Sequence, residues 1–466
     1  MNKFFLLLAL LISNAIFAQH EAINEVLKYY NQAKNFNGAV LVATNGKIDY
    51  LNGIGISNRQ SLTTINSKSK FKIASITKTF TAVLILQLYE TGKLDLNETI
   101  GKYFPEYTGE AKNKVTIKQL LTYSSGIPNC ESSGGFSIYQ KPVNIDSFIS
   151  KFSSGKLESE PGTKFNYDNG DFVILGKIIE KLTGKSFAQN LFDKILEPLE
   201  MVNTQILKST DIITGLVQSY TYDDSTKTYA GDEPYYIENF FSAGAMYSTV
   251  EDLLKFDQAI FNYKLLNKKT VDLMLTPNPK LDNVGLGFWI SQKYGSLNSK
   301  FAYRPGGILG ASANWIHIID SNRTIIVLSN TDGTNLFEMS QLLNTAAVGQ
   351  KTNLPIVPNQ ENKKIDFQNV AGTWVIDLRP TPNSEAYLKD FIITPQKGKF
   401  FGGEFYGSAF ANGQFNTDWD NLYFAFTTSD RENTYFHSGY INGNTISGNS
   451  YSAERKFISH WTGKKK

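Results

Sequence analysis

The chain has 466 residues, of which 41% are hydrophobic and 19% are charged, a composition typical of a globular protein of about two domains. Its formal net charge is +3 and no basic stripe is interleaved with aromatic residues, so nucleic-acid binding has little support. The single cysteine, Cys130, excludes an internal disulfide framework. H-E-x-x-H and paired C-x-x-C motifs are absent, so we expect no metal site and no cofactor.

The N-terminus has the pattern of a secretory signal peptide. Lys3 precedes an apolar run from Phe4 to Ile12, and Ile16-Phe17-Ala18 follows before Gln19, which predicts cleavage after Ala18. A membrane anchor is the weaker interpretation, because a bilayer span needs about 20 apolar residues. We therefore expect residues 1–18 to be removed and the mature protein, without a transmembrane segment, to be exported to the periplasm or secreted.

Residues 19–350 are predicted to form one domain. A helix is expected from about Glu21 to Ala33, then a β-hairpin from Gly38 to Gly53 that turns at Asn45-Gly46. The later expected elements are a helix after Ser75, helices over Ile117–Tyr123 and Phe172–Leu182, strands over Gly285–Ile290, Ala313–Ile319 and Thr324–Leu328, and a helix over Leu336–Val348. Strands at both ends of the domain with helices between them predict one antiparallel sheet assembled from both ends.

Residues 351–366 are polar and proline-containing and are expected to be a linker. From residue 367 to 466 the composition changes, because 20 of 100 residues are Phe, Tyr or Trp against 13% overall. Short alternating runs such as Tyr423–Thr427, and a second Asn-Gly pair at Asn442-Gly443, predict a small all-β barrel or sandwich. Its aromatic residues are expected mainly in the core.

The most informative residues are Ser75 and Lys78, one helical turn apart. A serine hydroxyl is a poor nucleophile unless a neighbouring base takes its proton, and a lysine at i+3 lies on the same helix face. The spacing S-x-x-K occurs four times in the chain. Only the copy at Ser75 opens a convincing amphipathic helix, whose apolar stripe comprises Ile76, Phe80, Val83, Leu84 and Leu88.

Histidine is the usual base for a serine nucleophile, but none of the four histidines suits that role. His20, His437 and His460 lie near the termini or in the last domain, and His317 is expected to be a hydrogen-bonded core residue of a strand. No G-x-S-x-G motif is present, which argues against an α/β-hydrolase. The base is therefore predicted to be a lysine or a tyrosine.

Tyr167 and Asn169 supply a second candidate pair, in a segment that leads into the predicted Phe172 helix. A tyrosine becomes a useful base only when cations stabilise its phenolate, and Lys78 with a second cation can do so.

Taken in order, Ser75-x-x-Lys78, Tyr167-x-Asn169 and Arg304-Pro305-Gly306 resemble the three motifs of the serine β-lactamase-related, penicillin-binding family. That family includes class C β-lactamases, D-Ala-D-Ala carboxypeptidases, D-aminopeptidases and esterases. The resemblance extends from about Ile23 to Val348, with further matching stretches at Leu120–Pro128, Pro198–Met201, Ser242–Thr249 and Gly285–Phe288.

The resemblance implies an α+β fold of the β-lactamase/transpeptidase type. Such a domain has three layers, an antiparallel sheet flanked by helices, with a helical lobe beside the sheet and the site between the two. It implies a serine hydrolase that acts on a small-molecule or peptide substrate, with cell-wall material among the candidates. Ser75, Lys78 and Tyr167 would be catalytic, and Asn169, Arg304, Gly306 and Gly307 would bind substrate or form the oxyanion hole.

The third motif departs from the family pattern, because relatives usually have Lys-Thr-Gly or His-x-Gly there. Arg304 keeps a positive charge, which can stabilise the Tyr167 phenolate or bind a substrate carboxylate, but it cannot act as a base. Pro305 removes a threonine hydroxyl and one backbone donor. The alternative hypothesis is therefore a catalytically dead domain that serves, with its β-barrel module, as a ligand-binding protein.

Overall fold

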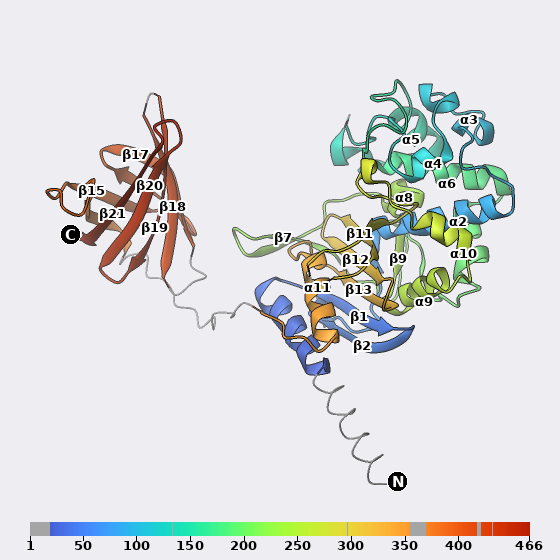
Figure 1. The fold of residues 1–466 in the computed structure, drawn as a ribbon, viewed down its shortest axis with the longest axis horizontal. Helices are drawn as coiled ribbons and strands as arrows, with labels where there is room; N and C mark the ends of the chain where they lie inside the picture. The colour runs from blue at the N-terminus through green and yellow to red at the C-terminus, as the bar shows by residue number, and fades with distance from the viewer. Residues whose placement is uncertain (1–18, 133, 296, 355–369, 417–420, 431) are drawn as a thin grey trace, which may run out of the picture. The chain divides into compact units, whose positions relative to one another are not determined.

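The computed structural model describes residues 19–132, 134–295, 297–354, 370–416, 421–430 and 432–466. The chain divides into two compact units, residues 1–354 and 355–466 (Figure 1). Each unit has its own hydrophobic core. The predicted signal peptide and most of the predicted linker lie outside the described residues. No described helix has the length and apolar character needed to span a bilayer.

The first unit is built on a six-stranded antiparallel sheet with the order β10-β11-β12-β13-β1-β2. Its strands are β1 Gly38–Thr44, β2 Lys47–Ile54, β10 Trp289–Ser291, β11 Phe301–Ile308, β12 Ala311–Ile318 and β13 Arg323–Ser329. The N-terminal hairpin pairs with the C-terminal strands through β1 and β13, where Val40 lies opposite Val327. The expected sheet from both ends of the domain is confirmed.

Helices cover both faces of this sheet. On β12, Asn314 donates to Ser340 of α11 (Leu336–Ala347), whereas the next residue, Trp315, donates from Nε1 to Asp257 of α9 (Val250–Phe261). Successive residues of a strand point to opposite faces, so α9 and α11 lie on opposite sides of the sheet. This arrangement gives the three layers of the expected fold.

His317 is buried as a core residue, as predicted. Its ring stacks on Phe261 with centroids 3.4 Å apart, and Nδ1 lies 3.0 Å from Asp257 Oδ1. Asp257 therefore satisfies the polar groups of His317 and Trp315 while it ties α9 to the sheet.

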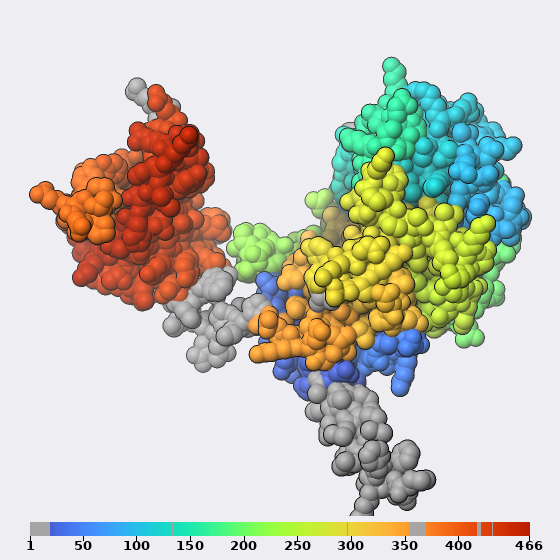
Figure 2. All heavy atoms as spheres, viewed as in Figure 1, coloured from blue at the N-terminus to red at the C-terminus, as the bar shows by residue number. Residues whose placement is uncertain are grey.

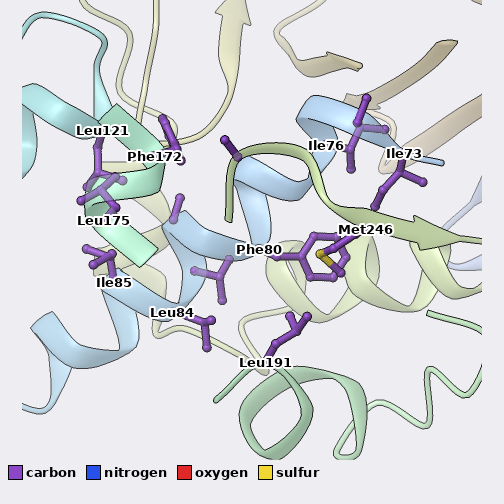
Figure 3. Packing of buried hydrophobic residues seen from close by; sticks show 14 of the residues in the cluster. Ile73, Ile76, Phe80, Leu84, Ile85, Leu121, Phe172, Leu175, Leu191 and Met246 are labelled. Carbon is purple, nitrogen blue, oxygen red and sulfur yellow. The ribbon is translucent and has the colours of Figure 1, made fainter. Parts of the chain in front are cut away.

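A helical lobe, coloured cyan to green, lies beside the yellow and orange strands of the sheet (Figure 1), and the atoms of the same colours adjoin one another in the space-filling view (Figure 2). Its core surrounds α2 (Thr77–Glu90), where Phe80, Leu84 and Ile85 are buried (Figure 3). Phe80 also stacks on Phe256, with ring centroids 3.7 Å apart. Leu121, Phe172 and Leu175 from neighbouring helices are buried in the same cluster.

The remaining α-helices and β-strands of the first unit are a helix over residues 19–33, β3 Ile56–Asn58, β4 Thr63–Thr64, β5 Phe71–Lys72, α3 Ile100–Tyr103, α4 Ile117–Leu121, α5 Ile145–Phe152, α6 Asn169–Thr183, α7 Phe187–Leu191, β6 Gln205–Ile206, β7 Tyr220–Asp223, β8 Thr228–Gly231, α8 Phe241–Gly244, β9 Met246–Ser248 and α10 Lys268–Met274.

The prediction of a strand over Gly285–Ile290 is wrong for most of its length, since β10 begins only at Trp289. Gly287 has a φ of +95°, which breaks an extended run, and its carbonyl accepts a hydrogen bond from Thr79 Oγ1 at 2.9 Å. The segment is thus a turn that packs against α2.

The second unit is a closed barrel of eight antiparallel strands, which resolves the expected choice between a barrel and a sandwich. Its strands are β14 Gly372–Asp377, β15 Leu388–Pro395, β16 Phe400–Phe405, β17 Ser408–Asn416, β18 Leu422–Ser429, β19 Thr434–Asn442, β20 Thr445–Ser452 and β21 Phe457–Lys465. Aromatic side chains fill the interior, as predicted, and include Trp374, Phe391, Phe401, Phe405, Phe424, Phe426 and Trp461.

Candidate active site

Ser75 lies in a 3₁₀ turn, η1 (Ala74–Ile76), directly before α2. The preceding residue, Ala74, has a φ of +47°, a left-handed conformation that is costly for a residue with a Cβ. Such strain persists only where the surrounding structure imposes it, and it concentrates at functional sites. The turn thus presents the Ser75 hydroxyl at the junction between the sheet and the helical lobe.

Lys78 is fully buried, and its ammonium has three acceptors. Nζ lies 3.1 Å from Ser75 Oγ, 2.6 Å from Asn169 Oδ1 and 2.8 Å from the Ala243 carbonyl oxygen. These contacts come from η1, α6 and α8, so the amine is fixed where these elements meet α2.

Tyr167 reaches the same hydroxyl from the segment before α6. Its Oη lies 2.7 Å from Ser75 Oγ. The following residue, Asp168, caps α6 by accepting a hydrogen bond from the Asp171 backbone N–H, and this cap sets where the helix begins.

Arg304 lies on β11 and is completely buried. Its Nε donates to the Ser75 carbonyl oxygen at 2.8 Å, and its Nη2 lies 3.4 Å from Tyr167 Oη. The guanidinium carbon sits 4.9 Å from the ring centroid of Trp289 and 5.8 Å from that of Tyr123. An aromatic cage therefore holds this cation against the tyrosine rather than in solvent.

The charges in this group shift the pKa values of both candidate bases. Burial is the main cause that lowers the pKa of Lys78, and the neighbouring Arg304 charge lowers it further. Burial alone would raise the pKa of Tyr167, but the positive charges of Lys78 and Arg304 outweigh it and the net shift is downward. Both residues thus lose a proton more readily than their free counterparts.

Gly306 and Gly307 differ in what surrounds them. A Cβ on Gly306 would lie 2.4 Å from the Ile73 carbonyl oxygen and 3.2 Å from the Ser75 nitrogen, whereas a Cβ on Gly307 would meet nothing within 4 Å. Gly306 therefore lets β11 approach the nucleophile turn, and Gly307 borders open space.

Several residues that complete this group were not predicted as site residues. Tyr123 and Ala243 lie in stretches that carried the family resemblance, but the sequence did not assign them a contact. Trp289, Glu131 and Tyr139 had no sequence signal. Asn169 Nδ2 donates to Glu131 Oε1 at 2.9 Å and to the Tyr139 hydroxyl at 3.1 Å, which extends the hydrogen-bond network beyond Lys78.

The family model for β-lactamase matches residues 23–350, more than half of the chain. The chain belongs to the β-lactamase family. It is a serine hydrolase of that family, and its fold is the expected β-lactamase/transpeptidase-like fold followed by an all-β barrel.

Relatives of this β-lactamase-family hydrolase include penicillin-binding protein 4* of Bacillus subtilis, which is 28% identical over 71% of this chain and 76% of its own length. The teichoic acid D-alanine hydrolase of Staphylococcus aureus is 25% identical over 68% of this chain and 75% of its own length. Among solved structures, the octameric penicillin-binding protein homologue of Pyrococcus abyssi superposes with a TM-score of 0.65 at 20% identity, covering 95% of this chain and 99% of that one.

Proposed function

We propose that the protein is an exported serine hydrolase that forms an acyl-enzyme at Ser75 within residues 19–350 and cleaves an amide, peptide, lactam or ester. The observation that carries this proposal is that Ser75 Oγ lies within hydrogen-bond distance of two candidate bases, 3.1 Å from Lys78 Nζ and 2.7 Å from Tyr167 Oη. Nucleophilic catalysis requires a base within hydrogen-bond distance of the serine hydroxyl.

In the first step, Ser75 Oγ attacks the substrate carbonyl carbon while its proton passes to Tyr167 or Lys78. The new C–O bond forms, the carbonyl becomes an oxyanion, and the bond to the leaving group then breaks as that group takes up the proton. The backbone N–H groups of Ser75 and Gly307 are the proposed donors to the oxyanion, each typically worth about 3 kcal/mol.

In the second step, water attacks the acyl-enzyme and Tyr167 relays its proton back to Ser75 Oγ. Arg304 serves both steps by stabilising the Tyr167 phenolate, since its guanidinium lies 3.4 Å from the phenolic oxygen. The complete burial of Arg304 favours this role over direct capture of a substrate carboxylate. Asn169 orients Lys78 through a 2.6 Å hydrogen bond.

Peptidase or esterase activity is favoured over efficient β-lactam hydrolysis. Arg304-Pro305 stands where many relatives have Lys-Thr, and the lost threonine hydroxyl is one that relatives use on a substrate carboxylate. The names of the relatives add D-alanyl groups on teichoic acid to the candidate substrates.

The second candidate function is a catalytically dead ligand-binding protein with a β-barrel module. It rests on the altered third motif, and it predicts that Ser75 never becomes acylated. Export rests on the N-terminal pattern of residues 1–18.

Intact-mass spectrometry separates the two candidates. After incubation with a penicillin or p-nitrophenyl acetate, the wild-type protein should gain the mass of one acyl group, and Ser75→Ala should gain none. Ser67→Ala is the matched control, since Ser67 begins another S-x-x-K pair, and it should acylate as the wild type does. Absence of an adduct with every acyl donor would refute the enzyme and favour the binding protein.

If the adduct forms, rates with nitrocefin, a D-Ala-D-Ala peptide, a short-chain ester and D-alanine p-nitroanilide will identify the acyl donor. We expect the lactam to be the poorest of the four.

A further inference from the structure

Glu131 places a carboxylate beside the nucleophile network, and no step of the proposed mechanism uses it. Its Oε1 accepts hydrogen bonds from Asn169 Nδ2 and from the Tyr139 hydroxyl, each at 2.9 Å. Asn169 binds Lys78 Nζ through its other end, so Glu131 is two hydrogen bonds from the amine that contacts Ser75.

The position of Glu131 is fixed by three consecutive links between its loop and the segment that carries Tyr167. Asn129 Nδ2 donates to the Tyr167 carbonyl oxygen at 2.7 Å, and the Cys130 N–H donates to Asp168 Oδ1 at 2.9 Å. The third link joins Glu131 to Asn169. A side chain held in this way is preorganised, which lowers the entropic cost of binding a ligand.

Tyr139 supports the same carboxylate from a buried position. Its ring stacks on Phe240 with centroids 3.7 Å apart. Burial is the main cause that raises the pKa of Tyr139, with further contributions from Cys130 and Glu131, so its hydroxyl keeps its proton and remains a donor.

The other carboxylate oxygen of Glu131 is uncommitted. Among the described residues, Oε2 has no hydrogen bond and no lysine or arginine forms an ion pair with the side chain, which is half-buried rather than enclosed. Lys78, the amine at the other end of the Asn169 link, is fully buried and already hydrogen-bonded to three other groups. A half-buried anion without a cationic partner suits a positively charged ligand group.

We propose that Glu131 binds a protonated amine on the acyl part of the substrate. The inference rests on the proposed acylation of Ser75 and names the substrate class as aminoacyl esters or amides with a free amino group. An α-amino group lies two bonds from the carbonyl carbon, so an aminoacyl group on Ser75 keeps its ammonium beside the nucleophile through both steps. N-acylated substrates lack that charge and gain nothing from the carboxylate.

The test compares D-alanine p-nitroanilide with its N-acetyl derivative near pH 6.5, where the free amine is protonated. The wild-type enzyme should favour the free amine in kcat/KM by about 10- to 100-fold, the usual worth of a hydrogen bond to a charged group. Glu131→Gln keeps an oxygen for Asn169 and Tyr139 but removes the charge. It should abolish the preference by lowering kcat/KM for the free amine only.

Glu233→Gln is the matched control, because Glu233 is exposed and its carboxylate bonds Gln140, the neighbour of Tyr139. It should leave the preference unchanged. Equal losses for both substrates in Glu131→Gln would show that the residue only supports Asn169 and would overturn the proposal. The proposal is also overturned if p-nitrophenyl acetate acylates Ser75 but the wild type shows no preference for the free amine. Failure of every acyl donor would instead refute the proposed function.

Discussion

At the scale of single residues, the site is organised by where positive charge lies. Tyr167 is partly buried and lies between Lys78 and Arg304, whose charges lower its pKa against the opposing effect of burial. Arg304 also lowers the pKa of Lys78. One buried guanidinium thus favours the basic form of both groups that touch Ser75 Oγ, whichever of them takes the proton.

The pH profile of acylation tests this role of Arg304. A base is active when deprotonated, so kcat/KM for a neutral ester should rise with pH through the pKa of that base. In Arg304→Gln the pKa values of Tyr167 and Lys78 should both rise, which moves this rising limb to higher pH. The rate at pH 7 should then fall about tenfold for every pH unit by which the limb moves. Stopped-flow or steady-state rates with p-nitrophenyl acetate from about pH 6 to 9 measure the limb.

Arg304→Lys is the control for this profile, because it keeps the charge and loses only the planar fork. The rising limb of its pH profile should move less toward high pH than the limb of Arg304→Gln. If the pH profile of Arg304→Gln matches that of the wild type, the Arg304 charge does not lower the pKa of the catalytic base.

At the scale of elements, the site depends on the close approach of β11 to η1. Gly306 makes this approach possible, because any side chain there would enter the space of the Ile73 carbonyl and the Ser75 nitrogen. In the register of β11 with β12, Gly306 lies opposite Ala313. Arg304 precedes Gly306 and Gly307 follows it along β11, so both residues are positioned by the approach of this strand to η1.

Gly306→Ala should displace the strand from the nucleophile. The added Cβ would sit 2.4 Å from a backbone oxygen, which cannot move as a flexible side chain can. We expect acylation to slow by about 100-fold, the usual cost of a misplaced reacting group, and stability to fall by about 1–3 kcal/mol. Burst kinetics and chemical denaturation measure the two effects.

Gly307→Ala is the comparison for folding, because its Cβ has open space and its N–H is retained. It should unfold at the same denaturant concentration as the wild type. If Gly306→Ala is acylated at the wild-type rate, the close contact between β11 and η1 is not needed for catalysis.

At the scale of the whole molecule, the chain divides into units with separate cores, and the barrel is closed by its own strands. His437 is buried in the barrel, 2.7 Å from Ser450 Oγ and 2.9 Å from Thr428 Oγ1. Burial lowers its pKa to about 4 from the usual 6.5. His437 therefore stays neutral in the folded barrel over a pH range in which it is protonated in the unfolded chain.

The barrel should lose stability in acid for this reason. The contribution of His437 is fully present above pH 6.5 and is lost as the pH falls toward 4, because the unfolded state binds more protons in that window. The slope is about 1.4 kcal/mol per pH unit within it. Denaturation of residues 370–466 at several pH values between about 4 and 7 measures this slope.

His437→Gln should flatten the slope, while His460→Gln, at an exposed position, should leave it unchanged. An equal slope in wild type and His437→Gln would assign the acid sensitivity to other groups.

Much of the fold followed from local patterns. The alternation around Asn45-Gly46 predicted the β1–β2 hairpin, and the aromatic-rich, glycine-punctuated tail predicted the all-β unit. The strand predicted at Gly285 failed because Gly287 takes a positive φ and turns the chain into contact with α2, a tertiary constraint that alternating hydrophobicity does not encode.

The sequence by itself determined the family and the candidate nucleophile, since three short motifs in order carry their chemistry in residue type and local spacing. Only the tertiary structure decided which other side chains contact Ser75. Tyr167 and Arg304, 92 and 229 positions from Ser75, meet its hydroxyl and its carbonyl because the start of α6 and β11 pack against the same turn. Glu131 joins them through Asn169, a contact that depends on how the Glu131 loop packs against the start of α6 and that local sequence does not encode.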